Sequence, residues 1–157
     1  MEGSEYLLTC AEVAVALAGF SALIIALTNR GDSSIDPVSR AVVSTLIERS
    51  LVAVFLSLFP ILLSGLSIAP AHWWSICSAV LAMYIASLAW RAGAQRRKSP
   101  ETREYLPAPA FSALMIVGLF VLFLQILHAL GLGIPQSVWW YLVGLTWILM
   151  SASYMFY

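Results

Sequence analysis

The chain has 157 residues, of which 61% are hydrophobic and only 10% are charged, and its mean hydropathy is +0.90. Because soluble domains carry about 25% charged residues, this composition excludes an ordinary soluble domain and indicates a protein built for lipid. The 8 basic and 8 acidic side chains cancel to a net charge of zero. No nucleic-acid partner is expected, because nucleic-acid binding needs a concentrated basic surface.

Runs of apolar residues predict five membrane spans, since a helix needs about 20 residues to cross the hydrocarbon core. The expected spans are residues 6–28, 50–68, 73–92, 110–130 and 138–156. The predicted fold is therefore an all-α, polytopic five-transmembrane-helix bundle, with residues 1–157 forming a single transmembrane domain.

The first span carries one ionisable side chain within the hydrocarbon, Glu12. A charged group costs about 2.5–3.5 kcal/mol at the centre of a membrane, and somewhat less toward an interface. Small residues recur at every fourth position of this span and predict close helix packing: Ala14, Ala18, Ala22 and Ala26. Ala14 lies about 200° around the helix from Glu12, so packing and the carboxyl should use different faces.

The second helix should begin before its span. Asp36 is a good N-cap and Pro37 suits the first helical position. A helix from Pro37 to Ile68 is about 46 Å long, which exceeds a hydrocarbon core of about 30 Å. We therefore expect two or three turns to extend into the cytoplasm.

Charged side chains gather where the second and third spans meet the cytoplasmic face. One interpretation is a vestibule, or a docking surface for a partner protein, formed by Arg40, Glu48, Arg49 and Arg91. The structural alternative is that Arg49 reaches the interface along its apolar stem and that Glu48 pairs with Arg91.

The third span has a small-residue stripe of its own, consisting of Ser78, Ala82 and Ala86, which is expected to pack against another helix. A basic run follows this span, and we expect it to contact lipid headgroups: Arg96, Arg97 and Lys98.

The basic residues predict the orientation of the bundle. With five spans, all 8 fall on or beside one membrane face: Arg30, Arg40, Arg49, Arg91, Arg96, Arg97, Lys98 and Arg103. By the positive-inside rule this face is cytoplasmic, which places the N-terminus outside and the C-terminus inside. Trp73, Trp74, Trp139 and Trp140 then lie at the outer interface. The expected location is the bacterial inner (plasma) membrane.

The fourth span adds Gln125 and His128, which share a helix face because they are three residues apart. This span runs from inside to outside, so both side chains should reach the depth of Glu12. We predict one polar cluster of Glu12, Gln125 and His128 in the outer leaflet. It is either an ion or proton site or a buried structural carboxyl held by hydrogen bonds.

No enzymatic motif is present, so the protein is not expected to be an enzyme, and no metal site or cofactor is expected. The two histidines, His72 and His128, are the only plausible haem ligands. A haem or small-ligand binder is accordingly the least favoured of the functions considered.

The favoured hypothesis is a small homo-oligomeric membrane protein that forms an ion- or proton-conducting pathway with an outer-leaflet carboxylate site. Homo-oligomerisation is expected because one small protomer has little room for an aqueous path. The alternative is a non-conducting membrane anchor or accessory subunit that docks a protein partner at the cytoplasmic face. Membrane lipids are the other expected partners.

Overall fold

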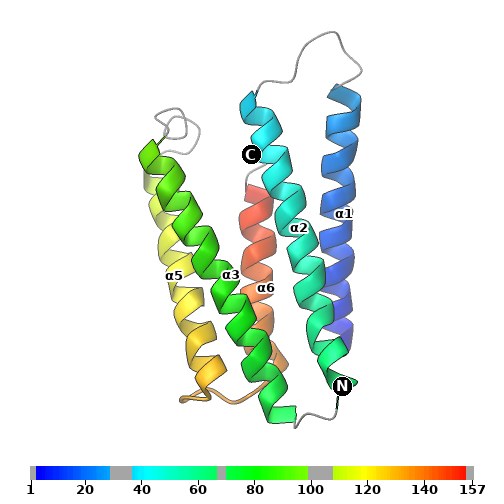
Figure 1. Cartoon of the computed structure of the whole chain (residues 1–157), viewed down its shortest axis with the longest axis vertical. Coiled ribbons are helices and arrows are strands. Elements are labelled where there is room, and N and C mark those ends of the chain that lie inside the picture. Colours follow the sequence, from blue (N-terminus) through cyan, green and yellow to red (C-terminus); the bar gives the residue numbers. More distant parts are fainter. Residues whose placement is uncertain (1–2, 29–36, 67–69, 99–107, 155–157) are drawn as a thin grey trace. The chain divides into compact units, whose positions relative to one another are not determined.

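The computed structural model describes residues 3–28, 37–66, 70–98 and 108–154. Within them the chain is entirely helical, and the helices are α1 (Ser4–Thr28), α2 (Pro37–Ser64), α3 (Pro70–Lys98), α5 (Ala108–Leu130) and α6 (Val138–Ser153) (Figure 1). Four of these helices are long and apolar enough to cross a membrane. The predicted all-helical membrane protein is confirmed to this extent.

Helix α6 is the shortest, with 16 residues. At 1.5 Å per residue it is about 24 Å long, somewhat less than a hydrocarbon core of about 30 Å. Five spans, an outside N-terminus and a cytoplasmic C-terminus therefore stay predictions.

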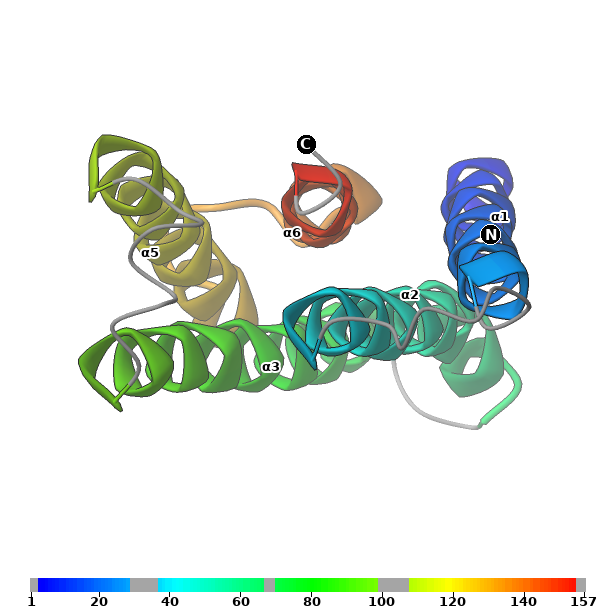
Figure 2. The same ribbon diagram turned by 90° about the horizontal axis from the view of Figure 1, so that it is seen from above.

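The helices form two compact units. The first unit comprises Met1–Ser67 and Leu145–Tyr157, and the second comprises Ile68–Gly144. In the first unit α1 packs against α2, and in the second α3 packs against α5 (Figure 2). Helix α6 contributes its first half to the second unit and its second half to the first.

Helix α2 begins at Pro37, where the sequence predicts its start, and runs through the buried Pro60 to Ser64. The predicted N-cap Asp36 and the predicted end at Ile68 lie outside the described residues. Six residues of α2, 37–42, precede the apolar stretch that begins at Val43.

Helix α1 is buried along one face, which consists of Leu7, Ala11, Ala14 and Ser21. Most of these side chains are small, which lets neighbouring membrane helices approach closely. Of the predicted alanine stripe, Ala14 is fully buried and Ala18 is half-buried, whereas Ala22 and Ala26 are exposed. A packing role for Ala22 and Ala26 stays a prediction.

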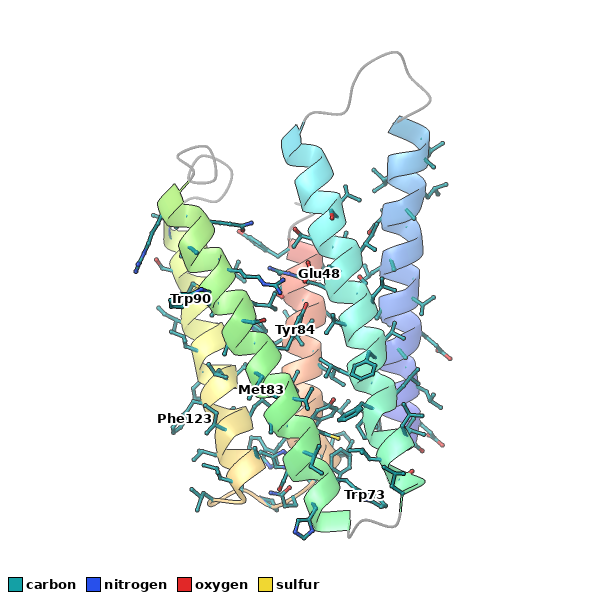
Figure 3. The ribbon with its side chains drawn as sticks, in the orientation of Figure 1. Glu48, Trp73, Met83, Tyr84, Trp90 and Phe123 are labelled. Atoms are coloured by element: carbon teal, nitrogen blue, oxygen red, sulfur yellow. The ribbon has the colours of Figure 1, made fainter. Side chains whose placement is uncertain are left out.

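The second unit packs through complementary faces of α3 and α5. The buried face of α5 consists of Gly118, Val121, Gln125 and His128, and that of α3 includes Ser78, Leu81, Ala82, Ile85 and Leu88. Ala86, the third residue of the predicted α3 stripe, is exposed. The opposite sides are apolar and outward-facing, as at Met83 and Phe123, which suits helices surrounded by lipid (Figure 3).

Helix α3 is longer than its predicted span, because it continues through Arg96 and Arg97 to Lys98. Alanine, glutamine and arginine all favour helix, so the helix does not stop where the apolar run stops. The basic run therefore forms the last turn of α3 and is not part of a loop.

Candidate functional site

The end of α5 is closed by a turn that brings the chain back onto His128. Gly131 has a positive φ of 67°, and its N–H donates to the His128 carbonyl at 3.2 Å. The Leu132 N–H donates to the Leu127 carbonyl at 3.0 Å. This pair of bonds is the Schellman pattern, which favours glycine at the left-handed position. The turn places Gln136 and Ser137, just before α6, beside the last turn of α5.

His128 is fully buried and uses both of its ring nitrogens. Its Nδ1 lies 2.7 Å from the Ser78 hydroxyl on α3, and its Nε2 lies 3.2 Å from the backbone nitrogen of Ser137. A backbone N–H only donates, so Nε2 must be an acceptor without a proton. The proton of the neutral ring is therefore on Nδ1, from which it donates to the Ser78 oxygen.

The backbone carbonyl of His128 also accepts hydrogen bonds. The Gln136 side chain donates from Nε2 to the His128 carbonyl, which also accepts from Gly131. The last carbonyls of a helix lack intrahelical donors, so these bonds cap α5. His128 thus joins α3, α5 and the turn before α6.

Gln125 lies one turn earlier on the same face and is also fully buried. Its Nε2 donates to the Trp140 carbonyl on α6 at 2.7 Å. Among the described residues its Oε1 is buried without a hydrogen-bond partner. A lone buried acceptor costs about 1–3 kcal/mol, so the close approach of α5 and α6 must compensate for it.

Gly144 permits this approach. A Cβ atom at Gly144 would lie 2.9 Å from Gln125 Nε2 and 2.5 Å from Leu81 Cδ2, both closer than carbon atoms tolerate. Beside it, Trp74 and the fully buried Tyr141 stack at 6.0 Å between ring centroids, tilted by 52°. We define the polar cluster as Ser78, Gln125, His128, Gln136 and Ser137. Its first three members are fully buried beside these apolar groups, and its last two are half-buried.

The structure brings together two of the three residues predicted to form an ion or proton site. Gln125 and His128 meet in the second unit, whereas Glu12 belongs to α1 in the first unit and has an exposed side chain. A cluster of all three stays a prediction. Within the second unit, Ser78 and Ser137 take the positions beside His128.

Arg49 connects α2 to the end of α6 within the first unit. Its Nη1 donates to the Ser151 carbonyl at 3.2 Å and lies 3.3 Å from the Ser151 hydroxyl. Because Ser151 is in the last turn of α6, the guanidinium meets the negative end of the helix dipole. Arg49 is thus a C-terminal cap, a role that the vestibule hypothesis does not include.

The remaining predicted charged residues belong to several helices. Glu48 is exposed on α2 (Figure 3). Arg91 is exposed on α3 in the other unit, and a pair between the two stays a prediction. Arg96 lies over the Phe111 ring at 4.3 Å from its centroid, and Arg97 is exposed. The side chains of Arg40 and Lys98 lie outside the described residues.

No group of three or more His, Cys, Asp or Glu side chains suited to a metal ion occurs in the described part of the chain. His72 is exposed, and His128 would have to give up its bond to Ser78 or Ser137 to ligate haem iron. Both cysteines, Cys10 and Cys77, are free thiols.

The first unit contains an open apolar groove of about 630 Å³ between α1 and α6. Its lining includes Cys10 and Val13 from α1 and Leu149 and Met150 from α6. The groove lies within the apolar part of α1, so lipid chains are its natural surroundings.

Sequence reasoning missed Gln136, Ser137, Gly144 and Ser151 as contact residues. The pair Gln136-Ser137 directly before an aromatic helix has a recognisable signal, since serine favours the N-cap position. Gly144 and Ser151 carry no local signal, because their importance depends on which helix packs beside them.

Comparison of the chain with protein-family models, with curated proteins and with solved structures found no match. Its function is therefore inferred from its own side chains.

Proposed function

We propose that the protein is a homo-oligomeric membrane protein in which copies associate through α1 and form a pathway for protons or cations. Glu12 is the ionisable site of this pathway. The observation that carries the proposal is the exposure of the Glu12 side chain on a helix long and apolar enough to span a membrane.

An exposed carboxyl in a span is expensive when lipid surrounds it, at about 2.5–3.5 kcal/mol near the membrane centre. Glu12 lies about 12 Å along the helix from Ser4, and it is about opposite the buried residues Ala14 and Ser21. A second protein surface over Glu12 removes its contact with lipid. Carboxyl groups at such an interface can share protons or line a water-filled path.

The surroundings of Glu12 favour such a contact. Ala16 and Gly19 lie within about 40° of Glu12 around the helix, and both are exposed. No neighbouring atom comes within 4 Å of the place where a Cβ on Gly19 would lie. Small residues on an open face allow close approach of another helix, so a second copy of α1 fits here.

The polar cluster around His128 serves a structural role in this proposal. Its ring is neutral and engaged at both nitrogens, so it offers no open position to a travelling proton. The cluster instead holds α3, α5 and the start of α6 together. Glu12 supplies the carboxyl group that exchanges protons or cations.

Proton and cation flux into proteoliposomes tests the proposal, with wild type compared with Glu12→Gln. Glu5→Gln is the matched control, because Glu5 is exposed on nearly the same side of α1 but within its first turn. We expect flux above that of empty liposomes for wild type and Glu5→Gln, and at least a tenfold loss for Glu12→Gln. Equal flux for Glu12→Gln and wild type, or none above empty liposomes, would contradict the role of Glu12.

A second candidate function is a non-conducting accessory subunit that docks another protein at the cytoplasmic face. It is favoured by the residues of α2 that precede the apolar stretch and by the exposed Glu48. A monomer in nanodiscs together with no flux would support this function over a pathway.

A further inference from the structure

The charges of the second unit are concentrated at one end of one helix. Residues 70–98 and 108–144 carry four basic side chains and no aspartate or glutamate. All four lie within the last eight residues of α3: Arg91, Arg96, Arg97 and Lys98. The described part of this unit is therefore strongly positive at the C-terminal end of α3 and uncharged elsewhere.

Two tryptophans near the ends of α3 have the spacing expected of residues at the two membrane interfaces. Trp73 lies near the start of α3 and Trp90 toward its end (Figure 3). They are 17 residues apart, or about 26 Å, close to the thickness of a hydrocarbon core. Trp90 is 80% exposed, as expected for an indole at a membrane interface. The basic end beyond Trp90 therefore lies at the depth of the lipid headgroups.

The structure fixes one of these cations against α5. The Arg96 guanidinium lies over the Phe111 ring, with 4.3 Å between Cζ and the ring centroid. Phe111 is in the first turn of α5, whose N-terminal end carries partial positive charge. A guanidinium stacked on a ring keeps its in-plane donors and loses less freedom on binding than a mobile side chain.

We propose that the end of α3 and the start of α5 bind the headgroup of an anionic phospholipid. In this site Arg96 and Arg97 contact the phosphate oxygens, and the acyl chains lie along the exposed side of α3 beside Trp90. The site goes beyond the proposed pathway and does not depend on it. A lipid is the occupant that fits, because the cations directly adjoin an apolar surface at headgroup depth.

Native mass spectrometry of the full chain in a neutral detergent tests the site. Phosphatidylglycerol and phosphatidylcholine are titrated separately onto wild type and onto the double variant Arg96→Gln/Arg97→Gln. We expect wild type to bind phosphatidylglycerol at least tenfold more tightly than phosphatidylcholine. Each basic residue near an anionic surface contributes about 1 kcal/mol, so the double variant should bind phosphatidylglycerol about 30-fold more weakly.

Two matched variants make the result specific to this site. Arg30→Gln/Arg40→Gln removes the same charge from positions before and within the start of α2, and it should change phosphatidylglycerol binding less than twofold. Phe111→Leu removes the stacking ring without changing charge and should weaken binding severalfold. Arg97→Gln alone, at an exposed position, gives the measurement if the double variant does not fold.

Equal binding of the two lipids by wild type would overturn the proposal. An equal loss of phosphatidylglycerol binding in Arg30→Gln/Arg40→Gln would also overturn it, because the lipid would then respond to the overall charge of the protein and not to this site. Competition by inorganic phosphate at constant ionic strength would indicate a site for free anions and would also overturn it.

Discussion

His128 carries its ring proton on Nδ1, because the Ser137 N–H occupies Nε2. Long-range ¹H–¹⁵N correlation spectra of histidine-labelled protein in nanodiscs report this directly. We expect a neutral ring with a protonated Nδ1 and a bare Nε2, identified as His128 by its absence in His128→Asn. A protonated Nε2 would contradict the hydrogen bonding described for the polar cluster.

Gly144 is expected to be intolerant of a single methyl group. In Gly144→Ala the new Cβ overlaps Leu81 and Gln125, so we expect a loss of about 1–3 kcal/mol in the free energy of unfolding. Gly93→Ala is the control, because a Cβ at Gly93 meets no atom within 4 Å and alanine favours a helix interior. Equal thermal stability of the two variants in detergent would show that the α3, α5 and α6 contact is looser than described.

Residue spacing predicted part of the polar cluster and missed the rest for a physical reason. The three-residue interval between Gln125 and His128 places both on one face of α5, and the structure shows both buried there. Their partners Ser137 and Trp140 reach them only because the turn after Leu130 reverses the chain. That geometry depends on the left-handed conformation of Gly131, so no periodic pattern in the sequence predicts it.

At the scale of helices, the end of α6 depends on a side chain from α2. In Arg49→Gln the charge-assisted bonds to Ser151 are lost, at about 1.5–3 kcal/mol for hydrogen bonds of this kind. We expect lower thermal stability and faster amide hydrogen exchange in the last turn of α6. Arg97→Gln, an exposed substitution on α3, should leave both unchanged, and similar exchange in the two variants would argue against the cap.

The burial of the alanine stripe in α1 varies along the helix for a geometric reason. A strict four-residue repeat advances about 400° per step, so Ala14 to Ala26 drifts about 120° around the helix. A packing face instead alternates steps of three and four, as Leu7, Ala11 and Ala14 do. Ala14 therefore lies on the buried face of α1, and Ala26 has rotated toward the side that carries Glu12.

For the whole molecule, hydropathy and run length are strong enough signals to predict an all-helical membrane protein, because every backbone group in lipid must bond within its own segment. The number of spans is a weaker inference. Sequence runs extend the last span to residue 156, whereas α6 ends at Ser153 and is not among the four helices long enough to span. Which helices contact each other depends on how their side chains fit together, and amino-acid composition does not predict this.

Orientation is measurable with single cysteines placed in a background without Cys10 and Cys77. We expect Glu5→Cys to react with a membrane-impermeant thiol reagent on intact cells, and Arg97→Cys to react only after lysis. Tyr154→Cys distinguishes five spans from four, since its exposed position should behave like Arg97 with five and like Glu5 with four. Labelling of Arg97→Cys on intact cells would show that the orientation is opposite to the proposed one.

If copies of the chain meet through the Glu12 side of α1, disulfide cross-linking in native membranes will capture that contact. In the background without Cys10 and Cys77, Ala16→Cys probes the exposed side, and Ala14→Cys probes the buried face as its control. We expect oxidation to convert Ala16→Cys to covalent dimers and to leave Ala14→Cys monomeric. A monomeric Ala16→Cys, or equal dimer formation by both variants, would contradict an assembly built on this side of α1.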